Sequence, residues 1–544
     1  MLASLLIAAA VLPQGRPALA AELLKLRLDG LEIPIRLDQL EIWSRHPQSS
    51  PFLASRGFGS AGADVAVWLE LLEADSRTDL LRLLRAPLLR DRTFGRQLLD
   101  SWAGGQMLAE LGDLLTTPEG KPTTALLQKT LQELLRQQRE VTALSLLQAL
   151  PLPSLSLQLD GLLALAQQWR QQLNRQRLAL RDLQQLVLPR RESRPLAFRE
   201  RQPPQPLHLT LAVDHRQEQL PLDVWPAPNA AAADAARRPW LLVLPGLGSN
   251  ADQFGWLASA LAQRGWSVVV LQHPGSDGQA LKAALDGQSP PPGAETLAVR
   301  LRDVAAVLAV QRQGRLPVQG DGVVLVGHSL GGLTALLAAG AQPEPGLEAR
   351  CRTAIKRLPL GNPSRLLQCQ LASIGLPKAL PRPADLRGMV LFNSFGSLLW
   401  PHGALAALPV PTLMVGGSLD LVTPPLEEQL SQFLPAAAGR SRLVLVEGGS
   451  HFSPVRMAER QEVVFRLGSE LVGVDPLLVQ GLLLGLSSDF LQGLPQGLPQ
   501  GPQQPQPLPS QVRRQQGVTA YEIGRARVGK ECTSWCRSRW SPYH

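Results

Sequence analysis

The stretch DGVVLVGHSLGGLTALLAAG, residues 321–340, constrains the fold of this 544-residue chain more than any other. An apolar, valine-rich run ends at Ser329, which stands between Gly327 and Gly331, and a second apolar run of helical composition follows it. A G-x-S-x-G sequence at a strand-to-helix turn is a nucleophile elbow, a sharp and strained turn at which neighbouring side chains would collide. The pattern predicts that Ser329 projects above a sheet, at a helix N-terminus that favours developing negative charge.

The segments around this turn alternate between two patterns. Short runs rich in Val, Leu and Ile are expected to be strands, and the longer runs between them helices. The strand-like runs lie at 239–246, 266–275, 389–394, 411–420 and 442–451, and the helical ones at 254–265 and 297–314. This alternation predicts an α/β fold, with a mostly parallel sheet that helices cover on both faces.

A nucleophilic serine needs a general base, and the base needs a third group that holds its tautomer. After a nucleophile elbow these partners are expected in the order acid, then histidine. Asp420 closes one expected strand, and His451 follows the expected strand that begins at Arg442. We therefore expect Ser329, Asp420 and His451 to form a catalytic triad.

Other residues compete for the roles of acid and base. Glu447 is the rival acid, but it lies only four residues before His451, at the end of the same strand. His402 lies near a proline and glycine turn, and His328 stands inside the elbow, where it is expected to pack beside the serine. We favour Asp420 and His451 over these residues.

The oxyanion of a tetrahedral intermediate needs hydrogen-bond donors. The backbone N–H of Leu330, directly after the serine, is expected to be one of them. The other is expected from the loop PGLGSN after the first core strand, where Leu247 is the first choice and Gly248 the second. This chemistry requires no metal ion and no cofactor, so none is expected.

The chain before the α/β region has two parts. Residues 1–20 hold a short apolar run and an Ala-Leu-Ala sequence, which are typical of a secretory signal peptide and predict export to the periplasm, the thylakoid lumen or the medium. Between residues 21 and 188, leucines recur at three- and four-residue spacing, which predicts a mainly helical N-terminal domain. The leucine stripes leave open a membrane-surface or partner-binding role.

Composition sets the later boundaries. Residues 189–206 are charged and proline-rich and indicate a linker to an α/β domain at 207–490. Within it, residues 340–388 form either a lid over the site or packing against the N-terminal domain. Residues 491–518, rich in Pro, Gln and Gly, are expected to be disordered. Residues 519–544 resemble translated sequencing-adapter DNA, and we expect them to be an artefact outside the fold.

Charge and cysteine content limit the partners. The formal net charge is +9, but the basic residues form no stripe and do not alternate with aromatic residues, so nucleic-acid binding is not expected. Of the four cysteines, two lie in the adapter-like segment. Cys351 and Cys369 either pair in an oxidising compartment or remain buried free thiols, and the sequence leaves both open.

With these residues in place, the chain resembles the α/β-hydrolases, and within them the exported cyanobacterial group labelled dienelactone-hydrolase-like, which carries an extra N-terminal domain of unknown function. The resemblance covers about residues 21–490 and rests on VGHSLGG, GNPSRLLQCQ, PTLMVGGSLDLVTPPLEEQ and LVEGGSHFSP. It implies an α/β-hydrolase fold with Ser329, Asp420 and His451 as the triad.

The chain departs from that group in two respects. Pro245 and Gly246 stand where many relatives have His-Gly, and dienelactone hydrolases proper use a cysteine nucleophile, so a lactone substrate is not carried over.

Three functions follow as hypotheses. The first is a serine carboxylic-ester hydrolase, which cleaves a lipid-like or short acyl ester through an acyl-enzyme. The second is a catalytically silent scaffold that binds a partner, and the third is a thioesterase or acyltransferase. The apolar character of residues 340–388 fits a small-molecule or lipid ester and leaves peripheral membrane contact open. The natural substrate and the oligomeric state stay open.

Overall fold

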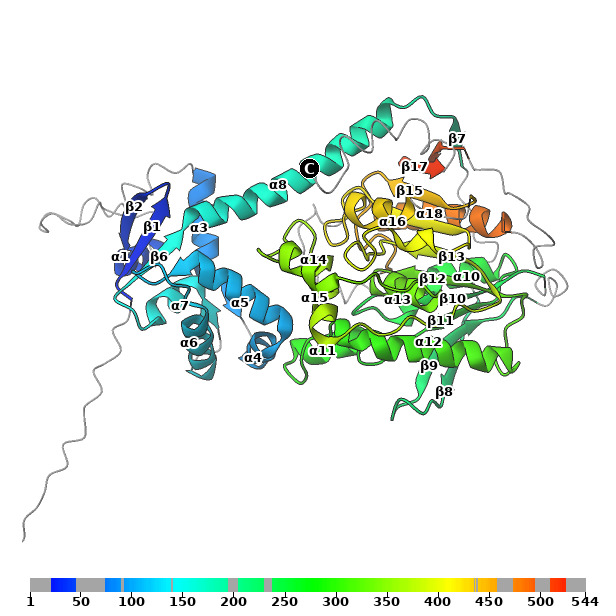
Figure 1. The fold of residues 1–544 in the computed structure, drawn as a ribbon, viewed down its shortest axis with the longest axis horizontal. Coiled ribbons are helices and arrows are strands. Elements are labelled where there is room, and N and C mark those ends of the chain that lie inside the picture. Colours follow the sequence, from blue (N-terminus) through cyan, green and yellow to red (C-terminus); the bar gives the residue numbers. More distant parts are fainter. Residues whose placement is uncertain are drawn as a thin grey trace, which may run out of the picture. The chain divides into compact units, whose positions relative to one another are not determined.

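The structure is a computed structural model, and its contacts divide the chain into two units (Figure 1). The N-terminal unit comprises Met1–Ala164 with Asp286–Pro290, and the large unit comprises Leu165–Leu285 and Pro291–His544. The described residues are 21–45, 74–89, 92–137, 140–193, 204–228, 237–434, 436, 439–456, 473–494 and 509–524. The expected signal peptide at 1–20 lies outside them.

The described part of the N-terminal unit is mainly helical. Its helices are α1 (Leu37–Arg45), α3 (Ala74–Arg85), α4 (Arg92–Asp100), α5 (Trp102–Leu114), α6 (Thr124–Gln137) and α7 (Ala143–Ala149). The leucine spacing that predicts these helices also explains their packing, since Leu127, Leu131 and Leu135 of α6 lie on one face and are buried in the core of the unit.

The N-terminal unit also contains sheets, which the leucine pattern does not predict. Four strands pair in the order β2-β1-β6-β4, and two more form a separate pair. Their bounds are β1 (Leu23–Leu28), β2 (Leu31–Arg36), β3 (Pro87–Leu89), β4 (Leu115–Thr116), β5 (Val141–Thr142) and β6 (Ser154–Gln158). The β1–β2 hairpin turns at Asp29 and Gly30, whose positive φ values of 47° and 81° suit a two-residue turn.

Helix α8 (Leu159–Gln185) crosses the boundary between the units, which falls after Ala164. The predicted boundary at residue 188 is therefore wrong. The leucine periodicity continues through the whole helix and gives no sign of which unit each turn packs against. Most of α8 belongs to the large unit.

An eleven-stranded sheet runs through the large unit, in the order β7-β16-β17-β15-β14-β13-β12-β10-β11-β9-β8. The six strands from β15 to β11 in this order are parallel, and antiparallel strands flank them on both sides. The bounds of the strands up to β15 are β7 (Arg190–Glu192), β8 (Leu207–Leu211), β9 (Leu220–Trp225), β10 (Trp240–Leu244), β11 (Val268–Leu271), β12 (Val323–His328), β13 (Leu386–Phe392), β14 (Thr412–Gly417) and β15 (Arg442–Val446).

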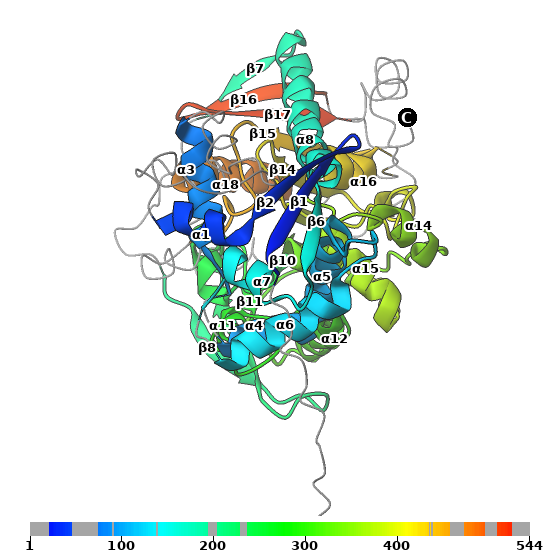
Figure 2. The same cartoon turned by 90° about the vertical axis from the view of Figure 1, so that its left-hand side faces the viewer.

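Helices cover both faces of this sheet (Figures 1 and 2). Successive residues of a strand point to opposite faces, and Val243 and Val326 share one core with α10 (Gly255–Ala262) and α18 (Pro476–Gln492). Helix α13 (Leu330–Ala338) packs on β10, β12 and β13, and α12 (Leu297–Arg312) packs on α13. The predicted α/β fold with a mostly parallel, doubly covered sheet is confirmed.

The C-terminal part of the chain corrects two predicted boundaries. Strand β17 (Val518–Gly524) pairs with β15 and with β16 (Gln511–Gln515), which pairs in turn with β7. Ala520 and Tyr521 are buried, so the exclusion of residues 519–524 from the fold is wrong, as is the expectation of disorder for β16. Strand β16 is mostly polar and follows a Pro- and Gln-rich stretch, so its sequence gives no clear strand signal. Residues 525–544 lie outside the described part.

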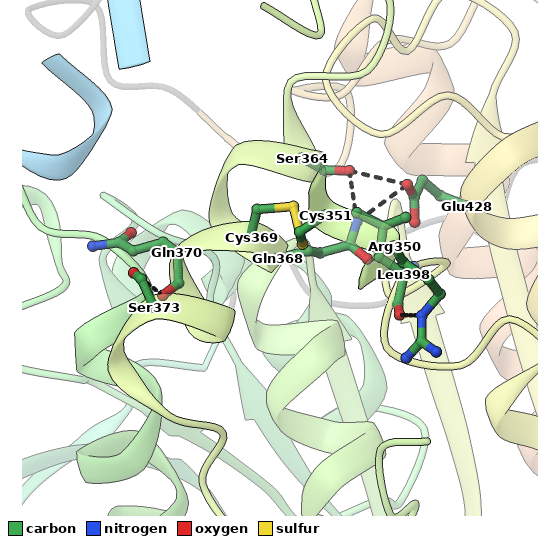
Figure 3. Close-up of a disulfide and its surroundings, with 9 residues drawn as sticks. All are labelled: Arg350, Cys351, Ser364, Gln368, Cys369, Gln370, Ser373, Leu398 and Glu428. Carbon is green, nitrogen blue, oxygen red and sulfur yellow. Dashed lines mark hydrogen bonds between the residues drawn. A yellow bond between two sulfur atoms is a disulfide. The ribbon is translucent and has the colours of Figure 1, made fainter. Parts of the chain in front are cut away.

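Residues 340–388 contain α14 (Leu347–Ala354) and α15 (Ser364–Ile374), which a disulfide between Cys351 and Cys369 joins (Figure 3). The sequence left this pairing open. On the same helix as Cys369, Gln368 donates a hydrogen bond to the buried carboxylate of Glu428, 3.2 Å away. Ser364 donates its backbone N–H to the carbonyl of Val422. The segment is therefore tied to the loop that follows β14.

Candidate active site

Ser329 occupies the turn between β12 and α13 in a backbone conformation that side chains rarely adopt, with φ 52° and ψ −120°. The glycines on either side are required by packing. A Cβ atom on Gly327 would lie 2.4 Å from the carbonyl oxygen of Gly331, and one on Gly331 would lie 1.9 Å from that of Leu244. The collision expected from the sequence is thus present, and the turn leaves the serine side chain facing the carboxyl ends of the strands.

Ser329, His451 and Asp420 form a continuous hydrogen-bonded chain. The Oγ of Ser329 lies 3.0 Å from Nε2 of His451, and Nδ1 of His451 lies 3.0 Å from Oδ2 of Asp420. Asp420 accepts a hydrogen bond from the Nδ1–H group of His451. Nε2 of His451 then carries no proton and can take the one of the serine hydroxyl. All three side chains are buried. They follow three parallel strands, at the sheet edge where α/β folds bind ligands.

The carboxylate of Asp420 is surrounded by hydrogen-bond donors. Oδ1 accepts the backbone N–H groups of Val422 and Thr423, at 2.9 and 2.8 Å. Oδ2 accepts the Asn393 amide at 2.5 Å and the Thr423 hydroxyl at 2.6 Å, besides His451. Burial raises the pKa of Asp420, but His451 and these hydrogen bonds outweigh it and hold the pKa below its usual value. Asp420 is therefore an anion at neutral pH.

The rival residues lie elsewhere. Glu447 accepts hydrogen bonds from Gln184, at 3.0 Å, and from the Tyr521 hydroxyl, at 3.2 Å. The exposed side chain of His402 pairs with Glu344. His328 donates Nε2–H to the backbone carbonyl of His451 at 2.9 Å, and burial lowers the pKa of His328 to about 3. His328 is therefore neutral and supports the backbone of the histidine beside it.

The loop after β10 packs directly on the elbow. A Cβ atom on Gly246 would lie 2.9 Å from Nδ1 of His328 and 3.2 Å from the Cβ of Ser329, so any other residue would require the elbow to shift. The backbone N–H of Gly248 donates to the carbonyl of Ser276 at 2.8 Å, which removes it as an oxyanion donor. Among the described residues, the backbone N–H groups of Leu247 and Leu330 have no hydrogen-bond partner.

Two residues at this site escape sequence reasoning. Asn393 has a positive φ of 48° directly after β13, and the sequence carries a signal for it, since Asn393 lies at the end of the expected strand at 389–394 and Asn tolerates this conformation. Gln176 of α8 donates to the backbone carbonyl of Asp420 at 3.2 Å. No local pattern points to Gln176, which lies 244 residues from its partner.

The described residues contain no group of three or more His, Cys, Asp or Glu side chains that could hold a metal ion. Within the same residues, no helix has the length and apolar character needed to cross a membrane.

Two family models match the chain. One, described as an alpha/beta hydrolase family, matches residues 241–467 and so includes Ser329, Asp420 and His451. The other, described as an alpha/beta hydrolase of unknown function (DUF1400), matches residues 20–158, which lie in the N-terminal unit. No curated protein matches the chain.

Proposed function

We propose that this member of the α/β-hydrolase superfamily is a serine hydrolase. It cleaves carboxylic esters through an acyl-enzyme. The observation that carries the proposal is the chain of hydrogen bonds from Ser329 through His451 to the buried anion Asp420. A serine hydroxyl is a weak nucleophile by itself, and this arrangement supplies both the base and the group that orients it.

The proposed reaction has two steps. In the first, Ser329 attacks the ester carbonyl while His451 takes the hydroxyl proton, and the N–H groups of Leu247 and Leu330 bind the oxyanion. His451 then returns the proton to the leaving alcohol as the carbon–oxygen bond breaks. In the second step, His451 takes a proton from the water that attacks the acyl-enzyme. It then gives this proton to the Oγ of Ser329 as the acyl carbon–oxygen bond breaks, which releases the acid and the free serine. Asp420 stabilises the imidazolium in both steps.

The substrate proposal is a lipid-like or short acyl ester. Residues 340–388 are rich in Leu and Pro and are hydrogen-bonded to the loop of Asp420 through Ser364 and Val422. We propose that this segment forms a rim of the acyl site. The disulfide between Cys351 and Cys369 supports the further proposal that the protein is exported, because disulfides persist in oxidising compartments.

A fluorophosphonate probe tests the proposed function on the full chain. We expect the probe to label the wild-type protein at Ser329, and the wild-type protein to hydrolyse p-nitrophenyl esters, whose chain length then sizes the acyl site. Ser329→Ala should abolish labelling and most turnover while it keeps the fold. The matched control is Ser373→Ala, which changes an exposed serine of α15 and should leave both unchanged. A folded wild-type protein without labelling would instead support a silent scaffold.

A further inference from the structure

Arg300 of α12 is a buried cation with no role in the proposed triad. Its side chain is 1% exposed, and its three guanidinium nitrogens donate to Pro245, Ser276 and Thr334. Nη2 donates to the backbone carbonyl of Pro245, Nη1 to the Ser276 hydroxyl at 2.8 Å, and Nε to the Thr334 hydroxyl at 3.3 Å. Burying a charge is costly, so packing alone would favour an apolar side chain here.

The three acceptors belong to the three segments that surround the proposed oxyanion site. Pro245 begins the loop that contains Leu247. Ser276 lies after β11, and its carbonyl binds the N–H of Gly248 at 2.8 Å. Thr334 lies in the first turns of α13, and its hydroxyl donates to the carbonyl of Leu330 at 2.7 Å. One guanidinium group therefore connects both expected oxyanion donors to each other.

These contacts fix the orientation of the Leu247 N–H. On one side of it, Arg300 holds the Pro245 carbonyl, and on the other, Ser276 holds the Gly248 N–H. Gly246, between them, lies against Ser329. The peptide that carries the Leu247 N–H also carries the Gly246 carbonyl, which accepts the Ser249 N–H at 3.4 Å. The peptides before and after it are held at the Pro245 carbonyl and at the Gly248 N–H, so the unpaired N–H keeps one direction.

We propose that Arg300 is a positioning residue, whose guanidinium holds the loop at Pro245 and the first turn of α13 in the register that brings the N–H groups of Leu247 and Leu330 to one oxyanion. This inference rests on the proposed ester hydrolysis. Burial lowers the pKa of Arg300 to about 9, against the attraction of Asp303 and Asp277. The side chain is therefore a cation at neutral pH and keeps all its donors.

The test compares Arg300→Met with Arg302→Met, which removes an exposed guanidinium from the same helix. We expect Arg300→Met to lower kcat for p-nitrophenyl esters about 10- to 100-fold, because it misplaces an oxyanion donor without removing it. KM should change little. The affinity of a trifluoromethyl ketone, which forms a tetrahedral oxyanion on the serine, should fall by the same factor as kcat. Arg302→Met should match the wild-type protein.

Two further variants keep the proposal falsifiable if Arg300→Met does not fold. Arg300→Lys keeps the charge but cannot reach three acceptors, and Ser276→Ala removes one acceptor and keeps the arginine. Both should lose part of kcat and of ketone affinity with an unchanged KM. Full kcat in folded variants, or a ketone affinity that does not follow kcat, would overturn the inference alone. A wild-type protein without labelling or turnover would overturn the proposed function, and the inference with it.

Discussion

The most informative single substitution is Asp420→Asn, because the surroundings of this side chain predict how it fails. The carboxylate accepts five hydrogen bonds and donates none: two from backbone N–H groups to Oδ1, and three from Asn393, Thr423 and His451 to Oδ2. The backbone donors cannot turn, so the asparagine oxygen must face them. The amide nitrogen then takes the place of Oδ2 and points its protons at the donors of Asn393 and His451.

His451 can relieve this conflict only by moving its proton from Nδ1 to Nε2. Nε2 then bears a proton and no longer accepts one from Ser329, so the base is lost while the fold remains. A triad with this tautomer loses about 10³- to 10⁴-fold in kcat, which corresponds to about 4–5.5 kcal/mol in the activation barrier. KM should stay near the wild-type value. The free energy of unfolding should fall by no more than about 6 kcal/mol, since two hydrogen bonds to a charged acceptor are lost, each worth about 1.5–3 kcal/mol.

Steady-state hydrolysis of a p-nitrophenyl ester at neutral pH measures the loss, and urea unfolding measures the stability. Glu447→Gln is the matched control, because it makes the same chemical change at the rival acid. Its activity should equal that of the wild-type protein. The reasoning is refuted if folded Asp420→Asn retains more than about a tenth of the wild-type kcat, or if Glu447→Gln loses as much activity as Asp420→Asn.

Three more predictions concern stability. Gly331→Ala places a Cβ atom 1.9 Å from a backbone carbonyl oxygen. A urea titration should therefore show a loss in the free energy of unfolding above the about 1–3 kcal/mol of ordinary overpacking. A loss under about 1 kcal/mol contradicts this prediction. Burial lowers the pKa of both His273 and His328 to about 3, so the unfolded chain binds more protons between pH 6.5 and about 3, and stability should fall as the pH falls through that window. The expected loss from pH 6.5 to 5 is about 2 kcal/mol for each histidine, and urea midpoints that do not change would exclude it. A chain that ends at Val518 lacks most of β17, and calorimetry should show a melting temperature well below that of a chain that ends at Gly524. Equal melting temperatures would show that residues 519–524 do not contribute to the stability of the fold.

The sequence predicts the centre of the large unit well, for a physical reason. Parallel strands buried on both faces must be apolar throughout, so each one is visible, and the polar residue that ends it stands out. Ser329, Asp420 and His451 are found in this way, and the structure brings them together. Their catalytic role stays a proposal.

The contacts that hold the site are much less visible in the sequence. Arg300 lies inside an apolar helix pattern and reads as a surface residue, since its acceptors come from three distant segments. Strands β16 and β17 lie toward one side of the sheet, where a buried ion pair between Arg513 and Glu522 lies beside their buried apolar residues. Local periodicity does not encode such pairings.

The unit boundary inside α8 has a consequence for how this protein can vary. A recombination event or an expression clone cut at the charged stretch after residue 188 would remove the whole helix, and with it Gln176, the donor to the backbone carbonyl of Asp420. The same helix supplies the first turn that packs in the N-terminal unit. A clone that keeps this donor beside the proposed catalytic acid must therefore begin before α8 and not at the change of composition after residue 188.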